Sequence, residues 1–113
     1  MESIRYIGRI RSNRIRIPNE VFSSLGEPKY LHMVLTKDYI VLDSKVGKDS
    51  IPVKIYKKTY RKKDKTYTYV YLEIPEIILK VYRQIFNTKY YKVVYHPDTT
   101  QVILTLIPPE GIA

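Results

Sequence analysis

Five arginines stand within twelve positions near the start of the chain: Arg5, Arg9, Arg11, Arg14 and Arg16. The guanidinium group of arginine is a planar fork of N–H donors that matches phosphate oxygens and the edge of guanine, whereas the lysine ammonium is a point charge. The stretch itself contains no acidic residue, and Glu2 is the opposing charge just before it. The cluster therefore indicates a surface that binds a polyanion.

A second basic run lies in the middle of the chain and consists of Lys57, Lys58, Arg61, Lys62, Lys63 and Lys65. Over all 113 residues, Lys and Arg number 20 against 11 Asp and Glu, which gives a formal net charge of +9. Such an excess favours a nucleic-acid partner. The middle run by itself is interpreted equally well as the solvated tip of a hairpin.

The sequence contains few of the residues that catalysis requires. The chain has no cysteine, which excludes disulfides, thiolate metal sites and cysteine nucleophiles. Its two histidines lie apart, His32 in an apolar segment and His96 in a turn. Glu73 and Glu76 straddle the end of an expected strand, and no glycine-rich phosphate loop or nucleophile elbow is present. We therefore predict no enzymatic activity, no metal and no cofactor.

Hydrophobic patterning predicts a mainly β chain in two similar parts. In the first part, residues 1–43, we expect strands over 4–10 and 14–17, a short helix over 19–25, and strands over 30–35 and 39–42. Residues 44–52 are polar and contain Gly47, which predicts a linker. In the second part, residues 53–107, the order returns as strands over 53–60 and 66–74, a helix over 76–86, and strands over 89–95 and 101–107. Residues 108–113 form a tail.

Three local features are expected within these elements. Gly8 allows a kink or a bulge in the first strand. Asn13 suits a turn position with a positive φ angle. In the strand over 66–74, alternation separates two sets of side chains: Tyr67, Tyr69, Tyr71 and Glu73 on one face, and Thr68, Val70, Leu72 and Ile74 on the other.

An Ile-Pro pair ends the second strand of each part and suggests an internal repeat. The pairs are Ile17-Pro18 and Ile74-Pro75, which sets a period of 57 residues. One unit of about forty residues buries too little apolar surface to stand alone, so we expect two units to close a common core. The two units meet either within one chain, as a pseudo-dimer, or between the chains of a homodimer.

Residues 14–26 (RIRIPNEVFSSLG) resemble the signature of the AbrB/MazE/SpoVT family, Gly-Arg-x-x-Ile-Pro-x-Glu-hydrophobic-x-x-x-Leu-Gly. The positions that fit are Arg14, Ile17, Pro18, Glu20, Val21, Leu25 and Gly26. Asn13 stands where the signature begins with glycine, and Glu27-Pro28 replaces the Gly-Asp that usually follows it. The resemblance covers about residues 4–43.

The resemblance implies a swapped-hairpin barrel, in which two hairpin units interleave into one small barrel that binds duplex DNA. It further implies that arginines of the N-terminal hairpin contact the DNA, and that the protein is a transcription regulator or an antitoxin. Two departures bear on this. Phe22 and Ser23 occupy helix positions that are often basic in the family, and Tyr71 stands in the second part where Arg14 stands in the first.

We therefore predict a cytoplasmic duplex-DNA-binding protein, without a membrane partner, built from tandem AbrB-like units. The predicted DNA contacts are Arg9, Arg11, Asn13, Arg14 and Arg16, with secondary contacts from Arg61, Lys62, Lys63 and Lys65. One alternative is an antitoxin-like module that grips a protein partner through its second part. Another is a single-strand binder that stacks bases on tyrosines, namely Tyr67, Tyr69, Tyr71, Tyr90, Tyr91 and Tyr95. Packing of these tyrosines across neighbouring strands is the interpretation we favour over stacking on bases.

Overall fold

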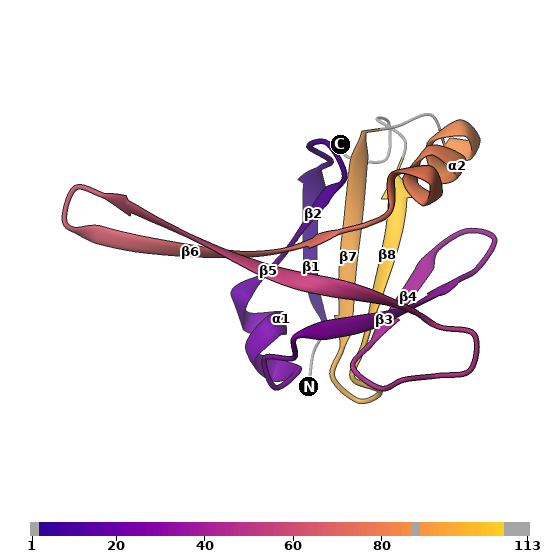
Figure 1. The fold of residues 1–113 in the computed structure, drawn as a ribbon, viewed down its shortest axis with the longest axis horizontal. Helices are drawn as coiled ribbons and strands as arrows, with labels where there is room; N and C mark the ends of the chain where they lie inside the picture. The colour runs from indigo at the N-terminus through magenta and orange to yellow at the C-terminus, as the bar shows by residue number, and fades with distance from the viewer. Residues whose placement is uncertain (1–2, 87–88, 108–113) are drawn as a thin grey trace.

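The computed structural model describes residues 3–86 and 89–107, which form eight strands and two helices. In chain order these are β1 (Ile4–Arg9), β2 (Arg14–Ile17), α1 (Asn19–Ser24), β3 (Tyr30–Leu35), β4 (Ile40–Asp43), β5 (Ile51–Lys62), β6 (Lys65–Glu73), α2 (Glu76–Phe86), β7 (Tyr90–His96) and β8 (Gln101–Ile107). The strands form one antiparallel sheet in the order β1-β7-β8-β4-β3-β5-β6-β2. A bridge between Arg11 and Arg14 brings its two edge strands together, so the sheet is a nearly closed barrel (Figure 1).

The mainly β prediction is confirmed, and most element bounds differ from it by one or two residues. The largest difference is β5, which begins at Ile51 instead of 53, so the predicted linker over 44–52 ends earlier. Pro52 caused this error because proline usually marks a strand end. Here Pro52 lies in β5 opposite His32 of β3, where the pairing of β5 with β6 has not yet begun. The predicted tail over 108–113 lies outside the described residues.

Strand pairing relates the first half of the chain to the second. The pairing of β1 with β7 corresponds to that of β5 with β3, and the hairpin β3–β4 corresponds to the hairpin β7–β8. The contacts of β2 with β6 and of β4 with β8 each join an element to its own counterpart. The remaining ladder joins β5 to β6, whose counterparts β1 and β2 are connected in the described residues only by the bridge between Arg11 and Arg14. Among the described residues, every strand ladder except the one between β5 and β6 therefore has an equivalent when the two halves are exchanged.

The register of β2 and β6 repeats this correspondence at the level of residues. Arg14 lies opposite Glu73, and Arg16 lies opposite Tyr71. Position 14 plus 57 is position 71, and position 73 minus 57 is position 16, so the first pair maps onto the second. The shift of 57 residues is the spacing of the two Ile-Pro pairs. The period expected from the sequence thus coincides with the exchange of the two strands in the barrel.

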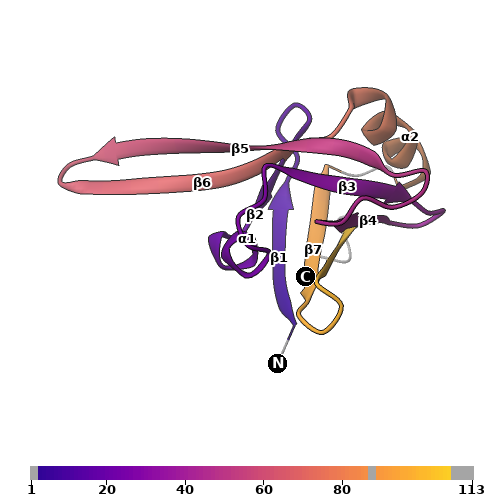
Figure 2. The same ribbon diagram turned by 60° about the horizontal axis from the view of Figure 1, so that its bottom comes forward.

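Alternate residues of the strands fill the barrel, and a helix packs on each of two sides (Figures 1 and 2). Side chains that are essentially inaccessible include Ile15, Leu31, Met33, Leu42, Leu72 and Leu104. α1 contributes Val21 and Phe22 to this core, and α2 contributes Leu79 and Tyr82. Within the described residues neither helix is long and apolar enough to cross a membrane.

β1 has no bulge at Gly8, so that part of the expectation was wrong. β1 pairs with β7 in unbroken register from Ile4 to Arg9. The missing side chain serves a different purpose, because a Cβ atom at position 8 would lie 2.5 Å from Oη of Tyr91. Glycine therefore makes room for the Tyr91 ring to cross β1 toward β2.

The turn between β1 and β2 also corrects an expectation. Ser12, with a φ angle of 57°, holds the left-handed conformation that we assigned to Asn13. The Arg14 N–H group donates to the Arg11 carbonyl oxygen at 3.0 Å, so Ser12 is the first of the two central turn residues. Asn13 instead accepts a hydrogen bond from the Ile74 N–H group through its carbonyl oxygen, at 3.0 Å.

β5 and β6 continue beyond the barrel as a two-stranded ribbon, which projects to the left in Figures 1 and 2. β3 accompanies β5 only as far as Lys54, and β2 accompanies β6 only from Val70 onward. β5 and β6 remain paired with each other out to Lys62 and Lys65. We call residues 58–69 the free ribbon, since within the described residues its two strands pair only with each other.

Candidate nucleic-acid interface

An open groove of about 1020 Å³ lies beside β2, between the β1 side of the barrel and the ribbon. Its lining consists of arginine, lysine and tyrosine alone: Tyr6, Arg9, Arg11, Arg14, Arg16, Lys58, Tyr60, Arg61, Lys62, Tyr67, Tyr69, Tyr71 and Tyr91. Seven of these thirteen residues are cations, and none is a carboxylate. The groove is therefore a strongly electropositive surface with aromatic walls.

Strand alternation explains why these side chains share one face. In β2, Ile15 and Ile17 are buried in the barrel, so Arg14 and Arg16 project from the outer face. Residues directly opposite each other in an antiparallel pair lie on the same face, which brings Tyr71 beside Arg16. The predicted tyrosine face of β6 is confirmed, and it is the same face that carries the arginines.

The tyrosine rings of β6 hold the guanidinium groups of β2. The Arg16 guanidinium carbon lies 4.0 Å from the centre of the Tyr69 ring, and that of Arg14 lies 4.9 Å from the centre of the Tyr71 ring. Arg14 also forms an ion pair with Glu73, with Nε and Oε1 3.6 Å apart. Such cation–π contacts fix the position of an arginine and leave its N–H donors available for a ligand.

Tyr69 and Tyr71 also contact tyrosine rings of β5. Tyr56 stacks on Tyr71 with ring centres 5.4 Å apart, and Tyr60 meets Tyr69 edge-on at 5.5 Å. The expected packing of tyrosines across strands is thus confirmed for these pairs. Tyr91 and Tyr95, by contrast, are 1% and 3% exposed and lie inside the barrel, so they do not belong to the tyrosine face.

Tyr91 lines the groove, and its hydroxyl group is hydrogen-bonded to the backbone of Arg16. It accepts a hydrogen bond from the Arg16 backbone nitrogen at 2.9 Å and donates one to the Arg16 carbonyl oxygen at 3.3 Å. Burial raises the pKa of Tyr91 well above its ordinary value of 10, although the hydrogen bond to Arg16 opposes this shift. The hydroxyl group is therefore neutral at physiological pH and retains the proton that it donates.

The structure brings together most, though not all, of the predicted contact residues. Arg9, Arg11, Arg14 and Arg16 all line the groove, and so do Arg61 and Lys62 of the secondary set. Asn13 is half-buried and is not part of the lining, and its carbonyl oxygen accepts a hydrogen bond from the Ile74 N–H group. Lys63 and Lys65 lie at the ribbon tip, also outside the lining.

The sequence reasoning missed Tyr6 and Tyr60 as groove residues, and it named Lys58 only as part of the second basic run and Tyr91 only for the single-strand alternative. Lys58 could have been found from alternation, since it is two residues from both Tyr56 and Tyr60 in one strand. Tyr6 and Tyr91 gave no local signal, because they reach the groove only through the pairing of β1 with β7.

A smaller hollow of about 390 Å³ lies on the other side of the β1–β2 turn. Arg9 and Arg11 line it together with Glu76, Arg83 and Lys89. The Arg83 Nη2 atom donates to the Ser12 carbonyl oxygen at 3.5 Å. The basic surface therefore continues from the groove around the turn to α2.

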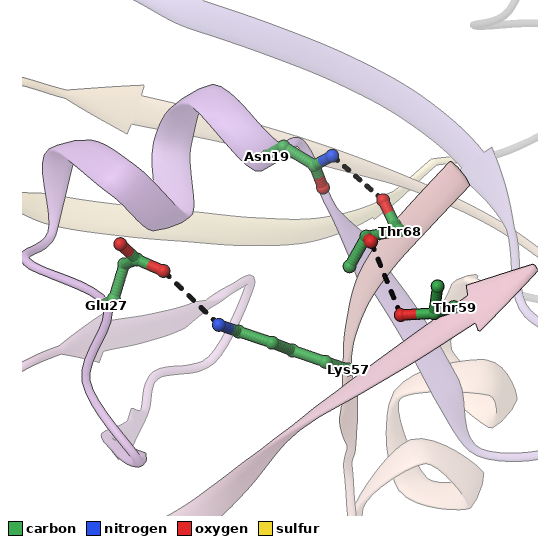
Figure 3. Close-up of polar contacts among 5 residues, drawn as sticks. All are labelled: Asn19, Glu27, Lys57, Thr59 and Thr68. Atoms are coloured by element: carbon green, nitrogen blue, oxygen red, sulfur yellow. Dashed lines mark hydrogen bonds and ion pairs between the residues drawn. The ribbon is translucent and has the colours of Figure 1, made fainter. Parts of the chain in front are cut away.

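Contacts with α1 and the loop after it fix the base of the ribbon (Figure 3). The Asn19 side chain donates to the Thr68 carbonyl oxygen at 2.8 Å, and Lys57 forms an ion pair with Glu27 at 3.2 Å. Thr59 and Thr68 join the two strands through their hydroxyl groups, 3.3 Å apart. The direction in which the ribbon leaves the barrel is thus set by side-chain contacts as well as by the ladder.

The histidines and carboxylates do not gather at any site in the described part of the chain. Within it, no three His, Asp or Glu side chains lie close enough together to hold a metal ion. His32 is half-buried opposite Asp43 in the β3–β4 ladder, and His96 Nδ1 lies 3.3 Å from Ser3 Oγ. Neither histidine lines the groove.

Comparisons with protein-family models, with curated proteins and with solved structures gave no match for this chain. The functional conclusion therefore depends on the geometry and chemistry of the groove itself.

Proposed function

We propose that this protein binds duplex DNA in the arginine–tyrosine groove and acts as a transcription regulator. The observation that carries the proposal is the composition of the groove lining, in which seven cations and six tyrosines occur without a carboxylate. Phosphate contacts from arginine and lysine supply most of the affinity of proteins for DNA. The groove offers four arginine forks, from Arg9, Arg11, Arg14 and Arg16, which are suited to phosphates and guanine edges.

We further propose that the barrel is of the swapped-hairpin type, formed by two tandem units within one chain. The equivalence of strand contacts between the two halves supports this, because each unit contributes the same elements in the same order. The register of β2 and β6 also supports the tandem arrangement, because a shift of 57 residues maps the pair Arg14–Glu73 onto the pair Tyr71–Arg16. In this arrangement the ribbon β5–β6 is the counterpart of the hairpin β1–β2, which carries the arginines.

Duplex DNA fits the groove better than a single strand does. A single-strand binder offers aromatic faces on which bases stack. Here Tyr69 is covered by Arg16, and Tyr71 by Arg14 and Tyr56. Because a guanidinium group lies over each of these two rings, the tyrosines serve to orient cations, and oriented cations favour the regular phosphate rows of a duplex.

A protein partner is a second candidate, favoured by one observation on α2. Ile77 and Val81 are 74% and 52% exposed, and their spacing of four puts them on one face of this helix. An exposed apolar pair next to the basic hollow suits an amphipathic protein surface. Ile77→Ser with Val81→Ser would abolish such an interaction and leave DNA binding unchanged.

Fluorescence anisotropy with a labelled random-sequence duplex, titrated over a series of salt concentrations, tests the DNA proposal. We expect log K to fall against log salt with a slope of about −4 to −6, the value for roughly five to seven phosphate contacts. The double variant Arg14→Ala, Arg16→Ala should bind about a hundredfold more weakly, at about 1.5 kcal/mol for each charged contact.

The matched control replaces Lys45 and Lys48, two exposed lysines of the loop before β5, with alanine. It removes the same charge away from the groove and should bind nearly as the parent does. A folded Arg14, Arg16 variant that binds as tightly as this control would overturn the site. Stronger binding of a single-stranded RNA of the same length than of the duplex would overturn the choice of duplex DNA.

A further inference from the structure

We infer that the free ribbon, residues 58–69, is an arm that enters the major groove of the duplex held by the arginine–tyrosine groove. This inference rests on the proposed function and extends it to a second element of the chain. Its observations are separate from those on β2. They concern the shape of the ribbon, the unpaired charge at its tip and its anchoring on the barrel.

The shape of the free ribbon fits one groove of DNA and excludes the other. From Lys58 and Tyr69 outward, β5 and β6 pair only with each other among the described residues, so no third strand thickens the ribbon. Paired strands lie about 4.8 Å apart before side chains are added. The major groove, about 12 Å wide, admits a two-stranded ribbon, whereas the minor groove, about 6 Å wide, does not.

The ribbon tip carries a net positive charge, and none of its cations forms an ion pair in the described structure. Its cations are Arg61, Lys62, Lys63 and Lys65, opposed in sequence only by Asp64. Within residues 3–86 and 89–107 the ion pairs are Arg14 with Glu73 and Lys57 with Glu27, so no tip cation is ion-paired. Four exposed cations on an isolated ribbon repel one another, and a polyanion that passes between them removes this repulsion.

Hydrogen-bonding side chains accompany the charge along both faces of the free ribbon. Directly opposite residues share a face, so Tyr60 and Tyr67 lie together on one face and Arg61 and Thr66 on the other. The Arg61 side chain nevertheless lines the groove beside Tyr60 and Tyr67. Tyr60 and Tyr67 are 44% and 43% exposed. Hydroxyl and guanidinium groups are the donors that read base edges in the major groove.

The free ribbon lies next to the groove in which we place the duplex. Tyr60, Arg61, Lys62 and Tyr67 of the ribbon also line the groove, so the two surfaces are continuous. The contacts of Asn19 and of Glu27 with the ribbon base fix its direction (Figure 3). The molecule is 43 Å long, which corresponds to about 13 base pairs at 3.4 Å each.

Two variants test the arm. The first replaces Arg61, Lys62, Lys63 and Lys65 with glutamine and keeps the ribbon. The second replaces residues 60–67 with Asn-Gly, a two-residue turn that joins Thr59 to Thr68, which already face each other in the ladder. The matched control replaces four exposed lysines of the other elements and loops with glutamine: Lys29, Lys37, Lys45 and Lys48.

The measurements are the salt dependence of duplex binding and the protection of guanine N7 from methylation by dimethyl sulfate, since N7 lies in the major groove. We expect the glutamine variant to reduce the salt slope by about 1 to 2, because each phosphate that a cation neutralises contributes about 0.9 to the slope and the four groove arginines account for about 3.6 of the expected total. In both variants the N7 protection at one end of the bound site should disappear. The control should keep both the slope and the protection.

Three results would overturn the arm, and they are distinguishable. A glutamine variant with the slope and the N7 protection of the control identifies the ribbon tip as a solvated hairpin end, while the Arg14, Arg16 dependence of binding still supports the groove. A reduced slope with unchanged N7 protection places the ribbon along the backbone instead of in the major groove. Absence of duplex binding by the parent protein overturns the proposed function and the arm together.

Discussion

The Tyr91 hydroxyl group holds both backbone polar groups of Arg16, accepting from its nitrogen at 2.9 Å and donating to its carbonyl oxygen at 3.3 Å. The two residues are 75 positions apart in the sequence, on β7 and β2. Between β1 and β2 the described residues form only the isolated Arg11–Arg14 bridge. One core side chain therefore closes the gap in the barrel at the strand that carries the groove arginines.

Removal of this hydroxyl group should destabilise the barrel. We expect Tyr91→Phe to lower the free energy of unfolding by about 1–3 kcal/mol, because it leaves the Arg16 N–H and carbonyl groups without their partner in a partly buried position. Urea denaturation measures the change. Tyr30→Phe, at a side chain that is 48% exposed, is the control and should change stability by less than about 0.5 kcal/mol. Equal stabilities of the two variants would contradict the proposed role of Tyr91.

A methyl group at Gly8 should also destabilise the barrel, because it would clash with the Tyr91 side chain. A Cβ atom there would lie 2.5 Å from Tyr91 Oη and 2.6 Å from Cζ, so Gly8→Ala should cost about 1–3 kcal/mol of stability. Gly47→Ala is the control, since no atom lies within 4 Å of the Cβ position there. The cost of Gly8→Ala should fall in a Tyr91→Leu background, as a double-mutant cycle would reveal. Strict additivity of the two changes would show that the clash is elsewhere.

Stability should decrease in alkaline solution. Burial raises the pKa of Tyr91 above 10, so the native state keeps a proton that the unfolded chain releases near its ordinary value of about 10. The contribution of Tyr91 to the free energy of unfolding should therefore be fully present below about pH 9 and be lost as the pH rises beyond 10. Tyr91→Phe should flatten this fall, measured by urea denaturation between pH 8 and 11. An unchanged pH profile in this variant would assign the effect to other groups, such as Tyr82, whose pKa burial also raises.

The ring of Tyr69 should matter for DNA affinity while its hydroxyl group should not. Tyr69→Leu removes the ring face that lies 4.0 Å from the Arg16 guanidinium carbon, and should weaken duplex binding by about two- to fivefold. Tyr69→Phe keeps the ring face and should bind like the parent in the anisotropy titration. The salt slope should be the same for all three proteins, because no phosphate contact is removed. Equal affinities of the Leu and Phe variants would argue against an orienting role of the ring.

Much of the fold could be predicted from local patterns. Strict alternation over residues 14–17 and 66–74 identified strands and their two faces. A helix over 76–86 followed from the spacing of five apolar residues: Ile77, Ile78, Val81, Tyr82 and Ile85. These signals are local because they depend only on which side of a strand or helix a residue faces. Pro52 shows their limit, since the rule that proline ends a strand does not apply where the partner on that side is absent.

The groove could be predicted only in part, because it depends on pairings between distant segments. The arginines were predicted from charge, and the tyrosines of β6 from alternation. The two sets lie on one face only because the register of β2 and β6 sets Arg16 opposite Tyr71. The fit of Tyr91 over Gly8 likewise joins β7 to β1. A single sequence carries no local signal for such long-range partners.

The two halves of the barrel correspond strand by strand, but their hairpins differ in length. β5 and β6 have 12 and 9 residues, whereas β1 and β2 have 6 and 4. Since both halves belong to one polypeptide, every molecule carries one long hairpin and one short one. A DNA site read by this surface consequently has a left and a right end that differ, so it need not be a palindrome, and the bound protein would give the DNA a direction.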